Sequence, residues 1–322
     1  MSAIARTPSH SHFIEVRGLT LHVRAWRTHG ADDRAPALVL LHGWMDVSAS
    51  FQFVVDALKK PWRVFAPDWR GFGLSGRTTT GPGTASYWFP DYFADLESIL
   101  DTFLPDDPVH LVGHSMGGNV ACIYAGIRPQ RVTTLTSLDG MGLPAARAEQ
   151  APSRYARWLD ALRSPETMRT YGDLDAVADR LKRNNPRLST ERAQYLARHW
   201  ARCNTDGQWE ILGDPAHKLP NPVLYRVDEI LACWQRITAP VLWVEAAQTT
   251  LYSMWARGDA KREHELRTEY RDRLSAFRHL QSLTIEDAGH MLHHDQPERV
   301  AQAIEDFIES HARTEPASAT RV

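Results

Sequence analysis

Short apolar runs alternate along this 322-residue chain with longer segments in which apolar residues recur every three or four positions. Short runs of this kind predict buried strands, and the longer segments predict helices that pack on both faces of a parallel sheet. Residues 13–17 and 19–26 instead alternate in polarity around Gly18, which predicts an antiparallel hairpin at a sheet edge. Further strands are predicted at 37–41, 62–67, 109–112, 132–138, 240–244 and 280–285. The pattern therefore predicts an α/β fold with a mostly parallel, eight-stranded sheet flanked by helices.

The alternation stops between residues 143 and 234. This stretch is rich in arginine and in aromatic side chains, is typical of helices and contains no clear strand. It is much longer than the loops that join elements in compact domains. We therefore predict an inserted helical cap at 143–234, between a first part of the core at 1–142 and a second part at 235–322. The final segment, 313–322, is predicted to be a disordered tail.

Composition indicates which partners and which cellular compartment to expect. The formal net charge of −2 gives no electrostatic reason to expect nucleic acid or an anionic membrane as a partner. The three cysteines are not spaced as metal ligands, which favours a reducing compartment. The first residues lack the apolar segment of a signal peptide, and no apolar run is long enough to span a bilayer. We therefore expect a cytoplasmic protein.

The residues Gly113-His114-Ser115-Met116-Gly117 lie between a predicted strand and a predicted helix. This is the pattern G-x-S-x-G in the context that gives it chemical meaning. A sharp strand-to-helix turn presents the serine hydroxyl, and the flanking glycines leave room for that turn. The first N–H groups of the helix and its positive dipole end favour negative charge that develops beside the serine. We interpret Ser115 as a nucleophile rather than as a helix cap.

Three further segments follow predicted strands in order along the chain: residues 42–44 (HGW), 68–75 (DWRGFGLS) and 288–290 (AGH). Together with GHSMG, they make the chain resemble the α/β-hydrolase superfamily, which includes esterases, lipases, haloalkane dehalogenases and epoxide hydrolases. Within it the chain is most similar to the serine-hydrolase-like branch, through HGWMD, GHSMGGNV and DPAHK. The resemblance extends from about residue 13 to residue 311 and matches the predicted cap only loosely.

The resemblance implies a role for each matching residue. Ser115 is the expected nucleophile and His290 the expected base, while the backbone N–H groups of Met116 and Trp44 form the expected oxyanion hole. A serine in the nucleophile position argues against dehalogenase and epoxide hydrolase chemistry, which uses a carboxylate nucleophile. We expect no cofactor and no metal ion, because acyl transfer needs only a nucleophile, a proton shuttle and oxyanion stabilisation.

The acid of the expected triad is not in its usual place. The loop in which the superfamily usually keeps an aspartate carries Thr249 at that position. Asp139 ends the neighbouring predicted strand, and some members of the superfamily keep their acid there. Glu245 and Asp287 are alternatives, as is a site without an acid. We predict that Asp139 contacts His290.

Several other polar residues are interpreted as structural. His114 is expected to pack under the sheet, and Asp46 to hold the oxyanion loop through nearby N–H groups. Asp68 and Arg70 are expected to pair or to cap loops. His217 has two interpretations, a structural residue or one that points into the cavity between cap and sheet.

The segment that follows His290 carries two more histidines and an aspartate, His293, His294 and Asp295. His290 and His294 lie one helical turn apart, a spacing that metal ligands can have. We favour a helix-cap region before Pro297 over a metal site.

The residues together predict a serine hydrolase that works through an acyl-enzyme. A carboxylesterase for small to medium apolar acyl groups is the first choice, with a small ester-like molecule as substrate. Lactone, amide or carbon–carbon bond hydrolysis by the same residues is the alternative among enzymes. A ligand-sensing protein that keeps the fold without catalysis is the alternative from another class. The intact Ser115, His290 and glycine turn favour the enzyme.

Overall fold

The computed structural model describes residues 6–77, 86–164 and 166–312, so the tail predicted at 313–322 lies outside the described residues. Its centre is an eight-stranded sheet in the order β1-β2-β4-β3-β5-β6-β10-β11. These strands are β1 (Ser9–Val16), β2 (Leu19–Arg27), β3 (Ala37–Leu41), β4 (Arg63–Pro67), β5 (Val109–His114), β6 (Val132–Leu138), β10 (Val241–Ala246) and β11 (Leu280–Ile285).

The sheet is mostly parallel and has an antiparallel hairpin at its edge, as predicted. From β4 to β11 the neighbours pair in parallel, and β2 runs antiparallel to both β1 and β4. The hairpin predicted around Gly18 is formed by β1 and β2. Along β3 successive residues enter opposite cores, Leu38 and Leu40 on one face and Val39 on the other. A strand buried on both faces is apolar throughout rather than alternating, as its sequence indicated.

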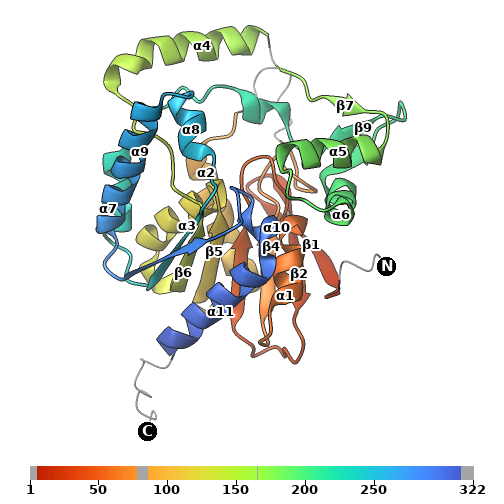
Figure 1. Ribbon diagram of the computed structural model, residues 1–322. Coiled ribbons are helices and arrows are strands. Elements are labelled where there is room, and N and C mark those ends of the chain that lie inside the picture. Colours follow the sequence, from red (N-terminus) through yellow and green to blue (C-terminus); the bar gives the residue numbers. More distant parts are fainter. Residues whose placement is uncertain (1–5, 78–85, 165, 313–322) are drawn as a thin grey trace.

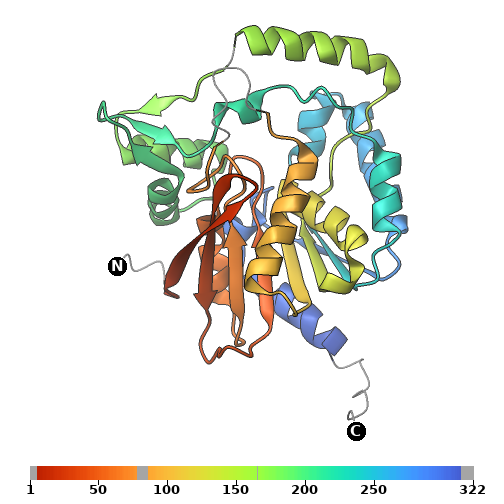
Figure 2. The same ribbon diagram turned by 180° about the vertical axis from the view of Figure 1, so that it is seen from behind.

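Helices cover both faces of the sheet, as Figures 1 and 2 show from opposite sides. The face in front in Figure 1 carries α1 (Gln52–Ala57), α10 (Leu292–Asp295) and α11 (Pro297–Ala312). The other face carries α2 (Phe89–Phe103), α3 (Met116–Ile127) and α9 (Ala260–Arg273), and α8 (Leu251–Ala256) follows β10. Short 3-10 helices are η1 (Ser48–Phe51), η2 (Pro129–Arg131), η3 (Ala148–Gln150), η4 (Pro215–Lys218) and η5 (Leu274–Ala276).

In the inserted segment, residues 143–164 and 166–226 lie above the sheet in both views, whereas residues 227–234 lie beside α3 (Figures 1 and 2). The helices of the inserted segment (residues 143–234) are α4 (Ala151–Arg163), α5 (Leu174–Asn184), α6 (Thr190–Trp200) and α7 (Val227–Trp234). It also holds a small antiparallel sheet of β7 (Thr170–Tyr171), β9 (Trp209–Ile211) and β8 (Ala201–Cys203). The prediction that this stretch contains no strand is therefore wrong. Strands of two or three residues are too short to show an alternating pattern in a sequence.

Helices α5 and α6 attach one part of the inserted segment to the core. Leu181 and Leu196 of these helices share an apolar cluster with Val47 and Phe53 of the core. Helix α4, by contrast, crosses the top of the molecule in Figure 1, and none of its residues is fully buried. Helix α7 packs against the core helix α3. The division into core and cap at residues 142 and 234 stays a prediction.

Candidate active site

Ser115 lies on the turn between β5 and α3. Its backbone has a φ of 52° and a ψ of −116°, a strained conformation that residues with a side chain rarely adopt. A Cβ atom on Gly113 would collide with the backbone of Gly117, and one on Gly117 would collide with the carbonyl of Leu41. Glycines are therefore needed at positions 113 and 117, where the backbone segments around the turn lie too close together for a side chain. The turn holds Ser115 beside the first N–H groups of α3, which have no partner within the helix.

His290 lies between Ser115 and Asp139. Its Nε2 is 2.9 Å from Oγ of Ser115, and its Nδ1 is 2.7 Å from Oδ2 of Asp139, both hydrogen-bond distances. The side chain of Asp139 is fully buried, whereas that of His290 is 22% exposed. Among the described residues, neither Glu245 nor Asp287 makes a hydrogen bond to His290. The structure thus brings together the three residues that the sequence singled out.

The surroundings of Asp139 explain the threonine in the usual aspartate position. Thr249 donates a hydrogen bond from Oγ1 to Oδ2 of Asp139 at 2.6 Å, and the N–H of Ala246 donates to Oδ1 at 3.2 Å. Glu245 lies 4.0 Å from Arg267 of α9 instead, and its pKa is raised by burial and by the nearby charge of Asp139. The sequence marked both Thr249 and Asp139 but did not reveal that one supports the other.

The two predicted oxyanion donors, Met116 and Trp44, line the same cavity. Met116 is the first residue of α3, so its N–H has no acceptor within the helix. Trp44 lies in the loop after β3, which Asp46 stabilises by accepting hydrogen bonds from the N–H of Val47 at 2.8 Å and from the hydroxyl of Ser50. The N–H groups at 44 and 116 suit a negatively charged oxygen, and this use of them stays a prediction.

A cavity of about 140 Å³ lies beside the Ser115 turn. Trp44 and Met116 form part of its wall, together with Tyr92 of α2, Trp158 of α4, and residues 216, 217 and 219–222. Among its lining residues, all from the described part of the chain, there is no lysine, arginine, aspartate or glutamate. The cavity therefore suits an uncharged, apolar group.

His217 lines this cavity, in line with the second of its two interpretations. Its ring is stacked between those of Phe72 and Tyr87, with centroids 3.8 Å away on each side. Its Nε2 donates to the backbone carbonyl of Arg70 at 3.0 Å. Burial lowers the pKa of His217 to about 3, so the imidazole stays neutral in neutral solution. His217 thus gives the cavity a polar but uncharged edge.

Three further histidines lie behind the site. His114 is buried and its Nε2 donates to the backbone carbonyl of His290 at 2.7 Å. His293 and His294 are buried in α10, with ring centroids 4.1 Å apart. Asp295 does not join them, because it accepts a hydrogen bond from the loop that carries His290.

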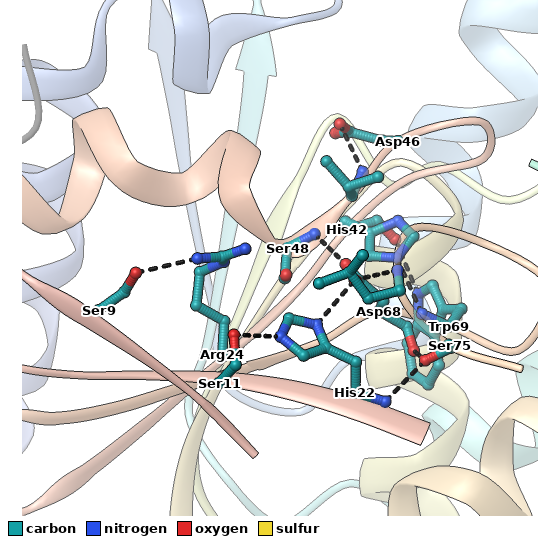
Figure 3. Close-up of polar contacts among 12 residues, drawn as sticks. Ser9, Ser11, His22, Arg24, His42, Asp46, Ser48, Asp68, Trp69 and Ser75 are labelled. Atoms are coloured by element: carbon teal, nitrogen blue, oxygen red, sulfur yellow. Dashed lines mark hydrogen bonds and ion pairs between the residues drawn. The ribbon is translucent and has the colours of Figure 1, made fainter. Parts of the chain in front are cut away.

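A second serine–histidine–aspartate chain lies at the edge hairpin, as Figure 3 shows. Nδ1 of His22 is 2.8 Å from Oδ2 of Asp68, and Nε2 is 2.9 Å from Oγ of Ser11. Asp68 also accepts hydrogen bonds from two backbone N–H groups, at 2.6 and 2.9 Å. Arg70 forms an ion pair with Asp95 of α2 and not with Asp68. No sequence pattern pointed to His22 or Ser11.

The matched segments and a comparison with known proteins identify the family. A family model described as alpha/beta hydrolase fold matches residues 36–297, which is most of the chain. The chain belongs to the α/β-hydrolase superfamily. A serine hydrolase-like protein of zebrafish (Danio rerio) is 28% identical to this α/β-hydrolase over 280 residues, or 84% of this chain and 81% of the zebrafish protein.

More distant relatives share the fold of this α/β-hydrolase. The 2-(acetamidomethylene)succinate hydrolase of Mesorhizobium japonicum is 24% identical, over 92% of this chain and 94% of that enzyme. Among solved structures, the thioesterase domain from the curacin biosynthetic pathway is similar with a TM-score of 0.77 and 24% identity, over 92% of this chain and 99% of that domain. In the described part of this α/β-hydrolase, no helix combines the length and apolar character needed to cross a bilayer.

Proposed function

We propose that this α/β-hydrolase is a serine hydrolase that forms an acyl-enzyme, and that it acts as a carboxylesterase on small, apolar acyl groups. The observation that carries the proposal is the hydrogen-bonded chain from Ser115 through His290 to Asp139, beside an uncharged cavity. A serine hydroxyl becomes an effective nucleophile when a base can take its proton and an acid orients that base.

In the proposed reaction, Nε2 of His290 takes the proton of Ser115 as Oγ attacks the ester carbonyl. Asp139 accepts the hydrogen bond from Nδ1 and stabilises the imidazolium that forms. The N–H groups of Met116 and Trp44 stabilise the oxyanion of the tetrahedral intermediate. His290 then gives its proton to the leaving alcohol. Water, activated by His290 in the same way, hydrolyses the acyl-enzyme and restores Ser115.

The size of the cavity favours short acyl chains. Its volume of about 140 Å³ is below the roughly 300–1,000 Å³ of common ligand pockets. Aromatic side chains, including Tyr92 and Trp158, form much of its wall. We therefore propose short-chain acyl groups as the preferred substrates.

The uncharged wall also bears on substrates suggested by relatives. The Mesorhizobium enzyme is named for a succinate derivative, which carries carboxylates. A carboxylate bound in a cavity needs a cation or several N–H donors, and the described lining residues include no lysine or arginine. We therefore do not extend that substrate to this protein.

The test is a series of p-nitrophenyl esters, from acetate to dodecanoate, together with a fluorophosphonate probe. We expect the highest kcat/KM for butanoate to hexanoate, a steep fall for longer acyl chains, and labelling of Ser115 in the mapped peptide. Faster turnover of matched amides or lactones would replace the carboxylesterase by another hydrolase. Failure of Ser115 to react with any ester or with the probe would favour the ligand-sensing alternative.

A further inference from the structure

A compact group of buried, ligand-type side chains lies behind the candidate active site and takes no part in the proposed reaction. Asp46 lies in the same loop as Trp44, and His293 and His294 lie in α10, shortly after His290. One ligand atom of each of the three side chains lies within 4.8 Å of the other two. Asp46 is 2% exposed, His293 0% and His294 3%. Residues that are distant in the sequence thus form one enclosed polar cluster.

This cluster contains polar atoms without partners. Oδ2 of Asp46, both ring nitrogens of His293 and Nε2 of His294 are buried and make no hydrogen bond among the described residues. Most buried polar side-chain atoms in proteins have a partner, and an unsatisfied one costs about 1–3 kcal/mol. Four such atoms in one small volume therefore point to a bound species.

The spacing favours a shared metal ion over a direct hydrogen bond. Oδ2 of Asp46 and Nε2 of His293 are 3.5 Å apart, longer than the roughly 2.7–2.9 Å of a charge-assisted hydrogen bond. Two ligands that lie about 2.0–2.1 Å from a tetrahedral zinc ion are roughly 3.3–3.4 Å apart. This pair therefore already has the separation of two zinc ligands. A ligand atom of His294 lies within 4.8 Å of both.

The chemistry of the three side chains selects the class of ion. Two imidazoles and one carboxylate are a ligand set of zinc enzymes, and imidazole nitrogen suits zinc, copper, nickel and iron. Calcium and magnesium prefer a shell of oxygen ligands, which this cluster does not supply. The carboxylate of Asp46 is the charge that a buried cation would balance.

We propose that Asp46, His293 and His294 bind one zinc ion or a similar transition-metal ion. The ion connects the loop that carries Trp44 to the segment that carries His290. It therefore stabilises the position of an oxyanion donor relative to the proposed base, without contact with the substrate. The site does not depend on the proposed esterase activity.

The test is metal uptake by the full-length protein. After treatment with a chelator and dialysis, the wild-type protein should bind about one equivalent of Zn²⁺ or Co²⁺, measured by elemental analysis, and Co²⁺ should give the visible absorption of a four-coordinate site. His294→Leu should lose this uptake, because an apolar group replaces a ligand. A far-UV circular dichroism spectrum like that of the wild type would show that the variant is folded.

The exposed histidines His10 and His12 on β1 provide the matched control, because exposed imidazoles also bind metal ions. His12→Ala should leave the uptake unchanged, and Zn²⁺ should raise its Tm as it does for the wild type. His293→Gln is the second ligand variant and should lose uptake like His294→Leu. The proposal is wrong if the wild type takes up no metal, in which case water fills the cluster. It is equally wrong if uptake survives in both ligand variants.

Discussion

Two serine–histidine–aspartate chains in this molecule have nearly the same hydrogen-bond geometry. In one, the histidine nitrogens lie 2.9 Å from the serine and 2.7 Å from the aspartate, and in the other these distances are 2.9 and 2.8 Å. We refer to them as the active-site chain (Ser115, His290, Asp139) and the hairpin chain (Ser11, His22, Asp68).

Their surroundings are different. Ser115 lies on a strained turn at the start of a helix and beside a cavity, whereas Ser11 lies within the regular strand β1, opposite Arg24. The His290 side chain is 22% exposed and that of His22 is fully buried. Hydrogen bonding alone therefore does not identify a nucleophile. The turn, the helix N–H groups and the access of a substrate to the histidine distinguish the two chains.

The aspartates also have different tasks. Asp139 accepts hydrogen bonds from the hydroxyl of Thr249 and from one backbone N–H in β10, while Asp68 accepts from two backbone N–H groups, one in η1 and one in the loop after β4. Burial on its own would raise the pKa of Asp68, but the hydrogen bond and charge of His22 hold it well below its usual value. Asp68 thus connects β2 to two loops, which is a structural task.

Replacing each serine in turn should give the largest difference in kcat between the two chains. Ser115→Ala should lower kcat for ester hydrolysis by about 10⁴–10⁶-fold, because the covalent step is lost. Ser11→Ala should leave kcat unchanged. Kinetics and peptide mapping after fluorophosphonate labelling test both. Labelling of Ser11 in the Ser115→Ala variant would show that hydrogen bonding suffices after all.

The second-largest loss of kcat is expected when Asp139, the acid of the active-site chain, is replaced. Asp139→Asn should lower kcat by about 10²–10⁴-fold with a smaller change in KM, because an amide cannot stabilise the imidazolium. Glu245→Gln is the control and should lower kcat by less than about tenfold, and adding it to Asp139→Asn should change little further. A larger loss in Glu245→Gln than in Asp139→Asn would identify Glu245 as the acid.

Asp68→Asn should instead act on stability. We expect a loss of about 2–4 kcal/mol in the free energy of unfolding, because buried donors lose their charged acceptor. The pKa of Asp68 is lower in the folded state than in the unfolded state. Asp68 therefore stabilises the folded protein fully above about pH 4, and this contribution is lost as the pH falls toward the folded-state pKa. The variant should lack this part of the acid dependence in urea unfolding. At pH 7, the kcat of the folded fraction of Asp68→Asn should equal that of the wild type. A loss of kcat as large as in Asp139→Asn would show that Asp68 is not merely structural.

The smallest effect is expected for the residue that supports the acid. Thr249→Val keeps the shape of the side chain and removes the donor to Asp139, which should lower kcat about tenfold with little change in KM. Thr249→Ser should restore most of the activity, and Thr250→Val, at an exposed neighbouring position, is the matched control. Equal kcat values for the valine and serine variants would exclude a role for the hydroxyl.

The main sheet could be predicted from the sequence, but the small sheet of the inserted segment could not. Strands β3 and β6 begin and end at the predicted residues, because five or more residues bounded by turn residues carry a clear signal. Strands β7 to β9 depend on tertiary contacts, since two or three residues have no detectable period.

For the site, positions at strand ends could be predicted, but side-chain contacts could not. Asp139 and His290 each follow a strand whose end meets the same edge of the sheet, so their proximity followed from the order of strands. The contact of His22 with Asp68 depends on side-chain direction between distant segments. The same holds for the cluster of Asp46 and His293. No periodicity in a single sequence encodes such directions.

Helix α4 tolerates mutation with little risk to folding. None of its residues is fully buried, yet Trp158 lines the cavity. Exchanges at exposed positions such as Tyr155 and Leu159 should change the free energy of unfolding by less than about 0.5 kcal/mol. An evolving lineage, or a directed-evolution library, can therefore vary this helix widely and explore new acyl preferences without compensating mutations elsewhere.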